Sequence, residues 1–402
     1  MKKVLVLLGL FFIVASCSKE EIIQEGIVVE VQNADNPYEV RSVVDYSQPS
    51  YLTRVPFPEQ ITNYREFSNW HPPLEAVVLD YDKDGYLDII ETQSEYGVFT
   101  RNKITFMKGT KEGTLVKDNI NSDIFEGLIH GRKGLVGDYN NDGWPDIFFI
   151  GHGYDHFTGD YPNEEHPILL LNEEGKSFQY IPITNVVGFF HTGTSGDIDG
   201  DGDLDVILVD GAGGGMNSYV LINNGDGSFQ DTILGYYDKF PLKYLPNIRG
   251  KFSSELIDID KDGDLDLVLA GHEYEEWNTP GLLLFNSPEG FTGSVELPID
   301  LTYGIVNDID FYDLNNDGTL EIIFTSTKGN PFYQGFKIRV YNQSGIDITA
   351  NYFDSGVNIS DDERWLFWMS FINKEDGLYF QGDDMYTQTT WKVTNSKFSR
   401  VK

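Results

Sequence analysis

From about residue 74 the chain alternates short apolar runs with polar segments rich in turn residues. In one representative stretch the apolar runs are residues 253–257, 265–270 and 282–285, and a further run begins at Phe291. Runs of this length rich in Val, Ile, Leu and Phe are typical of buried strands, because helices need longer periodic segments. Each unit of about 59 residues therefore predicts four short strands.

The turns between the third and fourth strands repeat along the chain. Each is rich in Asn or Gly and ends on an apolar residue, as in hairpin connections. The copies lie at residues 172–178, 223–229, 286–291, 342–346 and 395–398. The last copy predicts a sixth unit, with strands at 365–371, 378–380 and 390–393.

Six antiparallel four-stranded units without helices predict an all-β fold, a β-propeller with six or seven blades. An extended solenoid is the alternative architecture. We treat residues 37–402 as a single propeller domain. Strand-like runs at 38–44 and 51–55 are broken by prolines, and residues 38–70 are expected to complete the last blade or to form part of a seventh.

An acidic loop separates the first and second strands in five of the six units. Oxygen-bearing side chains recur at its first, third, fifth and ninth positions, a glycine at the sixth permits a sharp turn, and successive copies begin 58, 59, 61 and 55 residues apart. A single acidic turn would be an ordinary surface loop. Five copies in register predict calcium sites, because this alternation directs several oxygens to one point. For up to five ions, the predicted ligands are Asp80, Asp82, Asp84 and Asp88; Asp138, Asn140, Asp142 and Asp146; Asp197, Asp199, Asp201 and Asp205; Asp258, Asp260, Asp262 and Asp266; and Asp313, Asn315, Asp317 and Glu321.

Two features limit this prediction. Only the first copy carries an acidic residue, Glu91, at position twelve, as an EF-hand would, and an EF-hand also needs flanking helices where strands are expected here. In the sixth unit, Ile372 and Lys374 occupy the ligand positions of the degraded loop 373–377, so no metal is predicted there.

The tandem Asp-x-Asp-x-Asp-Gly-x-x-Asp loops, each followed by an apolar strand, resemble the FG-GAP/VCBS repeats of the integrin α-subunit propeller and of many bacterial surface proteins. The resemblance covers roughly residues 74–400 and implies one calcium ion between the first and second strands of a blade. The tripeptide Gly-Ala-Pro, expected from the family, is replaced here by residues 270–272, 150–152 and 210–212. This departure leaves the prediction of the metal loops unchanged but argues against transferring any ligand site known for the family.

The charge balance is strongly acidic, with 64 Asp and Glu against 29 Lys and Arg and a net charge of −35. This excess argues against a nucleic-acid partner, since no basic stripe offsets it. A hydrophobic content of 40% and an aromatic content of 14% argue against disorder.

The N-terminus resembles a bacterial lipoprotein signal. Lys2 and Lys3 precede an apolar run at 4–14, and residues 14–17 resemble a lipobox ending in Cys17, the one cysteine of the chain. Residues 1–16 are then the signal peptide, Cys17 is lipidated, and 17–36 form a tether. Residues 18–21 resemble the sorting signal of surface lipoproteins in Bacteroidetes, so we expect a lipid-anchored outer-membrane protein exposed at the cell surface, with no other membrane contact. An ordinary secretory peptide cleaved near Ala15 or Ser16 is the alternative.

The loops on the face opposite the acidic loops carry most of the histidines and several aromatic residues. Such side chains on a rigid scaffold suit a glycan or peptide ligand, although they could equally pack the tops of the blades. The candidate ligand-binding residues are Trp70, His130, His152, Tyr154, His156, His191, Arg249, His272, Tyr274, Trp277 and Tyr333.

An enzyme is a third class of function beside a glycan-binding and a protein-binding module. His152, His156, Asp160 and Glu164 could form an acid/base or metal site, and some polysaccharide lyases are calcium-bearing propellers. However, the chain contains no Gly-x-Ser-x-Gly, His-Glu-x-x-His or phosphate-loop motif. The sequence therefore favours a binding module and names no catalytic residue.

Overall fold

The structure, a computed structural model, describes residues 36, 38–40, 44–55, 76–92, 101, 103–154, 164–211, 217–272, 279–330, 332–362, 365–366, 368–374, 376–383 and 388–401. The predicted signal peptide, Cys17 and nearly all of the tether lie outside these residues.

The described residues form six four-stranded antiparallel sheets, each with its strands in chain order. The first two are β1 (Ala76–Leu79), β2 (Asp88–Glu91), β3 (Thr105–Gly109) and β4 (Leu115–Lys117), then β5 (Gly131–Gly137), β6 (Asp146–Gly151), β7 (Ile168–Glu173) and β8 (Ser177–Pro182). The next two are β9 (Phe190–Gly196), β10 (Asp205–Asp210), β11 (Tyr219–Asn223) and β12 (Phe229–Ile233), then β13 (Ser253–Ile257), β14 (Asp266–Ala270), β15 (Gly281–Phe285) and β16 (Gly293–Leu297). The last two are β17 (Ile305–Tyr312), β18 (Glu321–Gly329), β19 (Phe332–Tyr341) and β20 (Ile359–Ser360), then β21 (Trp368–Lys374), β22 (Gly377–Asp383), β23 (Gln388–Thr394) and β24 (Lys397–Arg400).

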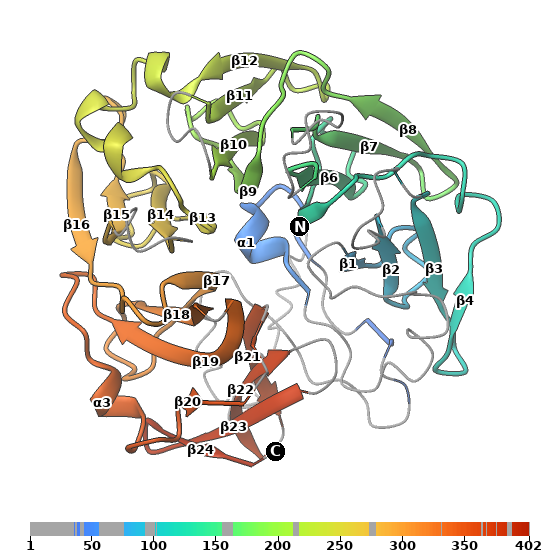
Figure 1. Cartoon of the computed structure of the whole chain (residues 1–402). Coiled ribbons are helices and arrows are strands. Elements are labelled where there is room, and N and C mark those ends of the chain that lie inside the picture. Colours follow the sequence, from blue (N-terminus) through green and yellow to red (C-terminus); the bar gives the residue numbers. More distant parts are fainter. Residues whose placement is uncertain are drawn as a thin grey trace, which may run out of the picture.

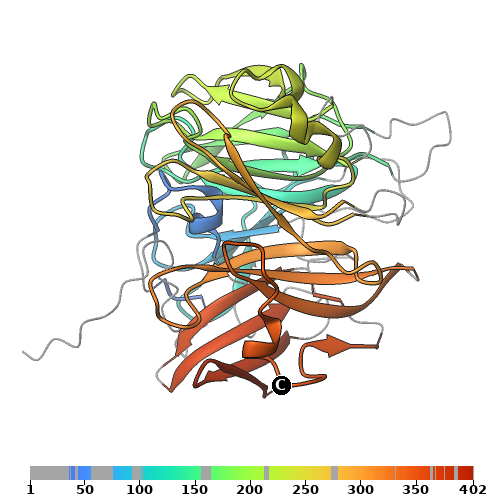
Figure 2. The same cartoon turned by 90° about the vertical axis from the view of Figure 1, so that its left-hand side faces the viewer.

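The six sheets are arranged radially, as the blades of a β-propeller (Figure 1). The first strand of each blade lies nearest the axis, and the first strands of consecutive blades contact one another. In the side view the strands run between the two faces of the ring (Figure 2). The predicted all-β propeller is therefore confirmed.

The hydrophobic core lies between neighbouring blades. Along β14, Leu267 and Leu269 pack toward the third blade, whereas Val268 and Ala270 pack toward the fifth. Both faces of a blade are thus buried, which explains why the strands read as continuous apolar runs instead of alternating with polar residues. Burial of each such leucine contributes about 1.5–3 kcal/mol.

Some predicted boundaries and elements differ from the structure. The last strand of the fourth blade begins at Gly293 instead of Phe291. The expectation of no helices was wrong, because short helical segments occur between strands: η3 (Leu234–Tyr236), η4 (Leu242–Asn247) and α3 (Thr349–Tyr352). All of them lie in connections, so the blade pattern is unchanged.

A short helix, α1 (Ser50–Thr53), occupies the centre of the ring (Figure 1). The strand predicted at 51–55 was therefore wrong. The Tyr51 hydroxyl accepts the Phe311 N–H at 2.9 Å, and the Ser50 hydroxyl accepts the Ser195 N–H at 2.9 Å. Ser50, Tyr51 and Thr53 are buried among the first strands. A short buried segment of this kind cannot be distinguished from a strand by its sequence pattern alone.

Residues 38–40 lie against the first blade. The Val40 N–H donates to the Gly85 carbonyl at 2.9 Å, and the Leu87 N–H donates to the Tyr38 carbonyl at 2.6 Å. Trp365, just before β21, packs against the same apolar cluster of the first blade. Residues 56–75 lie outside the described residues, so a contribution to a seventh blade stays a prediction.

Candidate functional site

The acidic loops of the first five blades share one hydrogen-bonding pattern. The Asp80 carboxylate accepts the N–H groups of Asp84 and Gly85, both at 3.0 Å. The first-position carboxylates of the other four loops make the same pair of bonds, at 2.8–3.1 Å; these are Asp138, Asp197, Asp258 and Asp313. Each fifth-position carboxylate also accepts the N–H of the seventh residue, at 2.8–3.0 Å. The five loops are therefore copies of one structure.

Two positions in each loop have left-handed backbone conformations. The sixth-position glycines have φ between 84° and 97°, as predicted from the sharp turn. The fourth position also has positive φ, 56–64° at Lys83, Asn141, Lys261 and Asn316 and 85° at Gly200. Sequence reasoning missed the fourth position, because only one of its five residues is a glycine.

The ninth-position carboxylate of each loop is buried at the start of the second strand. Asp88, Asp146, Asp205 and Asp266 have no exposed surface, and Glu321 is 2% exposed. Each aspartate accepts one N–H from its own loop and one from the end of the third strand; Asp146, for example, accepts those of Tyr139 at 2.9 Å and Asn172 at 2.7 Å. The ninth residue thus fastens the loop to the blade.

Burial makes these carboxylates hard to ionise. It raises the pKa of Asp146 to about 8 and those of Asp205 and Asp266 to about 7, and it raises the pKa values of Asp88 and Glu321. The nearby loop carboxylates raise the pKa of Asp146 further. A cation in the loop would favour the ionised form.

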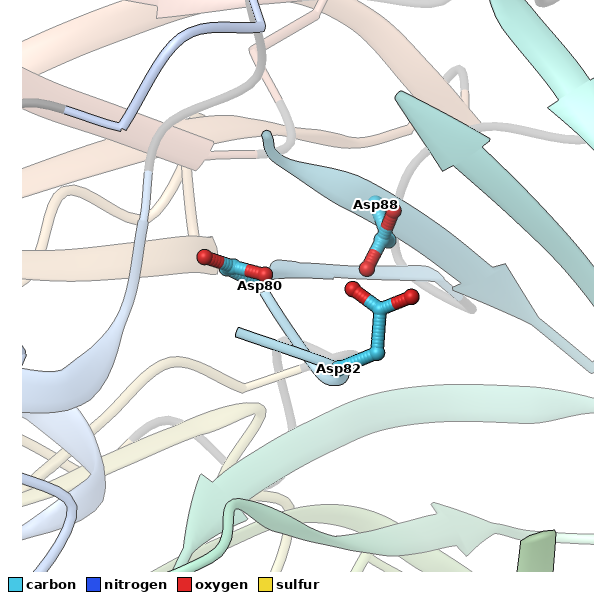
Figure 3. Close-up of side chains that lie close together, drawn as sticks. All are labelled: Asp80, Asp82 and Asp88. Atoms are coloured by element: carbon cyan, nitrogen blue, oxygen red, sulfur yellow. The ribbon is translucent and has the colours of Figure 1, made fainter. Parts of the chain in front are cut away.

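The loop carboxylates converge. Asp80, Asp82 and Asp88 each place an oxygen within 4.8 Å of the others, and their carboxylates approach one another at the junction of β1 and β2 (Figure 3). Two further groups converge in the same way: Asp197, Asp199 and Asp205 at the same positions, and Asp258, Asp260 and Asp262 at the first, third and fifth positions. In the second and fifth loops the third position is Asn140 or Asn315, whose amide oxygen accepts the fifth residue's N–H at 3.2 Å or 2.8 Å. All five loops therefore offer an oxygen-only donor set, which fits a hard cation such as Ca²⁺.

A side-chain amide from the next blade closes three of the loops. Asn172 donates to the Tyr81 carbonyl at 2.8 Å, Asn223 to the Tyr139 carbonyl at 2.8 Å, and Gln343 to the Ile259 carbonyl at 2.8 Å. The sequence showed the asparagines as a repeated turn signal, but not their bonding role. In the fifth blade the equivalent residue is Gln343 instead of the adjacent Asn342, so repetition of residue type alone could not have identified it.

On the opposite face, aromatic rings from the second, third and fourth blades form a continuous row. The ring centroids of His130 and His152 are 4.3 Å apart, those of His152 and Phe189 4.3 Å, and those of His191 and Phe252 4.3 Å. His152 and His191 meet edge to face at 5.1 Å. We call His130, His152, Phe189, His191 and Phe252 the ring row.

The ring row is partly buried: His152, His191 and Phe252 are buried, and only His130 and Phe189 reach solvent. His152 and His191 are 1% and 6% exposed, whereas His130 and Phe189 are half-buried. The guanidinium of half-buried Arg132 lies 5.5 Å from the Phe252 ring centroid. Burial, with His130 and Arg132 next to it, holds the pKa of His152 well below its ordinary value. The sequence had not selected Phe189, Phe252 or Arg132, because their neighbours in the row come from other blades.

The structure describes four further candidate ligand residues, which are Tyr154, Arg249, His272 and Tyr333. Buried His272 packs against Gly304, where a Cβ would overlap its ring. Tyr154 follows the ring row's His152 and is half-buried, Arg249 is exposed before β13, and Tyr333 pairs with Trp365 at 5.6 Å. Trp70, His156, Tyr274 and Trp277 lie outside the described residues.

Within the described chain, no helix has the length and hydropathy needed to cross a bilayer.

A comparison with protein families agrees with the repeated loops. Residues 197–269 and 258–324 match the model of the FG-GAP-like repeat. The comparison with curated proteins gives no significant match.

Solved structures resemble the chain at low identity. A lectin from Agrocybe aegerita that recognises non-reducing terminal N-acetylglucosamine is 17% identical, with a TM-score of 0.41 over 70% of this chain and 66% of the lectin. A candidate 6-phosphogluconolactonase from Bacteroides uniformis is 9% identical, with a TM-score of 0.45 over 79% and 81%. The rhamnogalacturonan lyase YesW is 10% identical, with a TM-score of 0.39 over 81% and 56%. At this similarity none of them identifies a ligand or a reaction for this chain.

The six radial blades and the repeated loop geometry therefore show a β-propeller, and residues 197–324 of this propeller match the FG-GAP-like repeat.

Proposed function

We propose that this protein is a calcium-stabilised surface lipoprotein that binds glycans through the face opposite its acidic loops. The identical hydrogen-bonding pattern of the five loops carries the metal part of the proposal. In each loop the side-chain oxygens at positions one, three, five and nine and the carbonyl at position seven would hold the ion. The ion neutralises carboxylates that burial and mutual repulsion otherwise keep from ionising, so it couples binding to folding.

The ring row carries the ligand part of the proposal. Half-buried His130, Phe189 and Arg132 offer an aromatic surface next to hydrogen-bond donors, and half-buried Tyr154 lies two residues after His152, which follows β6. Sugars bind such sites by stacking their apolar faces on rings and donating or accepting hydrogen bonds at their edges. The buried rings of His152 and His191 pack against those of His130, Phe189 and Phe252 and hold them in place.

Localisation follows from the N-terminal pattern. Lipidated Cys17 would anchor the protein in the outer membrane of a Bacteroidetes-like bacterium, and residues 17–36 would place the propeller at the cell surface. This part is tested by labelling cells with a radioactive fatty acid. A wild-type chain that takes up label, together with a Cys17→Ala variant that does not, supports it.

Glycan binding is tested by applying the full chain with calcium to a glycan array. Phe189→Ala and Arg132→Ala are expected to lose binding while the chain stays folded, with a cooperative melting transition in calcium. Tyr236→Ala, which removes an aromatic residue 67% exposed in η3, is the matched control and should bind normally. An array without any bound glycan, with a protein partner recovered in its place, would favour the adhesion alternative.

A further inference from the structure

A lysine of β3 places its charge on the first acidic loop. The Lys108 ammonium, from β3, lies 2.6 Å from Oδ2 of Asp82, the third-position carboxylate, and 5.1 Å from the Tyr81 ring centroid. Both side chains are largely shielded from solvent, at 33% and 16% exposure. Within the described residues, this is the one ion pair between a lysine or arginine and a carboxylate of the five loops.

The equivalent residues of the next three blades are apolar. The blades can be aligned on the residue at the end of the third strand whose N–H donates to the ninth-position carboxylate. In the first blade the Gly109 N–H donates to Asp88 at 3.0 Å, and in the second the Asn172 N–H donates to Asp146 at 2.7 Å. The residue equivalent to Lys108 is the one directly before this donor. The same alignment holds at Asn223 and Asn286. The residues in question are therefore Lys108, Leu171, Ile222 and Phe285. The lysine is peculiar to the first blade among these four.

The first loop also has a support that does not depend on an ion. Residues 38–40 lie beside it, with the Val40 N–H on the Gly85 carbonyl and the Glu39–Tyr86 bridge next to it. Gly85 and Tyr86 are the sixth and seventh positions of the loop. The N-terminal segment therefore braces the same turn that a metal ion would otherwise hold closed.

We propose that Lys108 is the resident counter-ion of the first loop and makes it the weakest of the five calcium sites; the inference rests on calcium binding as proposed above. An entering ion must displace the ammonium from Asp82 and then lies close to a like charge, and both effects oppose binding. Lys108 therefore sets the calcium affinity of the first loop relative to the other four. Its ammonium neutralises Asp82 at calcium concentrations too low to occupy the other loops.

The test is a calcium titration of the full chain by isothermal calorimetry. Wild type should show one step weaker than the rest, and Lys108→Met should strengthen that step by about tenfold or more. Lys108→Arg keeps the charge and should behave as wild type. Lys117→Met is the matched control, because Lys117 makes an ion pair of the same 2.6 Å length in the same blade, with Asp123 outside the loops.

Two further variants assign the effect to the first loop. Adding Asp80→Ala to Lys108→Met should abolish the strengthened step. Ile222→Lys, at the equivalent half-buried position of the third blade, should create a second weak step. If wild type binds calcium and Lys108→Met gives the same isotherm, the role of Lys108 is overturned. If wild type itself binds no calcium, the calcium proposal fails instead.

Discussion

The side-chain amide of Asn172, in the second blade, donates to the Tyr81 carbonyl in the acidic loop of the first blade at 2.8 Å. The same amide donates to the Pro145 carbonyl of its own blade at 3.1 Å. One residue thus joins two blades at the level of their metal loops. Because the contact recurs at Asn223 and Gln343, loop geometry and blade packing depend on each other around the ring.

Asn172→Ala is expected to lower the free energy of unfolding by about 1–3 kcal/mol, because it leaves two buried carbonyl groups without their donor. Denaturant unfolding of the full chain in calcium measures this. Asn224→Ala is the control, since the side-chain amide of Asn224 donates within its own exposed turn, to the carbonyl and hydroxyl of Ser228. Equal losses in the two variants would contradict the inter-blade role.

Gly202→Ala is expected to destabilise the chain by about 1–2 kcal/mol, because Gly202 has φ of 96° and an L-residue is strained there. Gly200→Asn should be neutral or stabilise by up to about 1 kcal/mol, since asparagine or lysine occupies the equivalent fourth position of the other loops with positive φ. At either glycine a Cβ would meet no atom within 4 Å, so crowding does not complicate the comparison. Melting temperatures that rank the two variants in the opposite order would refute this assignment.

Arg54→Ala is expected to lower the free energy of unfolding by about 2–4 kcal/mol. Arg54 follows α1, pairs with Asp308 at 2.7 Å and donates to the Met369 carbonyl at 3.0 Å, so its loss leaves a buried carboxylate without its partner. Its side chain is 26% exposed, which places the expected value below that of a fully buried pair. Lys176→Ala, which removes an exposed ion pair with Glu174, should cost almost nothing in the same assay.

Lys251 predicts a pH dependence of stability. Burial lowers its pKa from 10.5 to about 7 in the folded chain. Between these two pKa values the unfolded chain binds more protons at Lys251 than the folded chain does. The contribution of Lys251 to the free energy of unfolding therefore increases as pH rises. The wild-type chain should therefore gain stability relative to Lys251→Met between about pH 7 and pH 9. Parallel pH profiles for the two proteins would show that Lys251 titrates normally.

The acidic loops were predictable because all of their information lies within nine consecutive residues. Asp258, Asp262 and Gly263 specify the turn locally, and the first-to-sixth bonds form inside it. Burial of the strands was predictable for the same reason, since short apolar runs between turn signals have few alternatives.

Long-range contacts account for what the sequence did not predict. Tyr51 is helical at the axis because it bonds to Phe311, 260 residues away, and no local pattern contains that partner. Similarly, the sequence placed the histidines of the ring row in loops of one face and left open whether they bind a ligand or pack, whereas rings from three blades bury His152 and His191. Sequence spacing indicated the face on which they lie, but their exposure depends on neighbours from other blades.

The central claim is that calcium in the acidic loops holds the propeller together. The most direct test is scanning calorimetry of the full chain in calcium and in excess chelator. The account predicts that chelation lowers the melting temperature by at least about 10 °C and that added calcium restores it. Superimposable melting curves in calcium and chelator would contradict it.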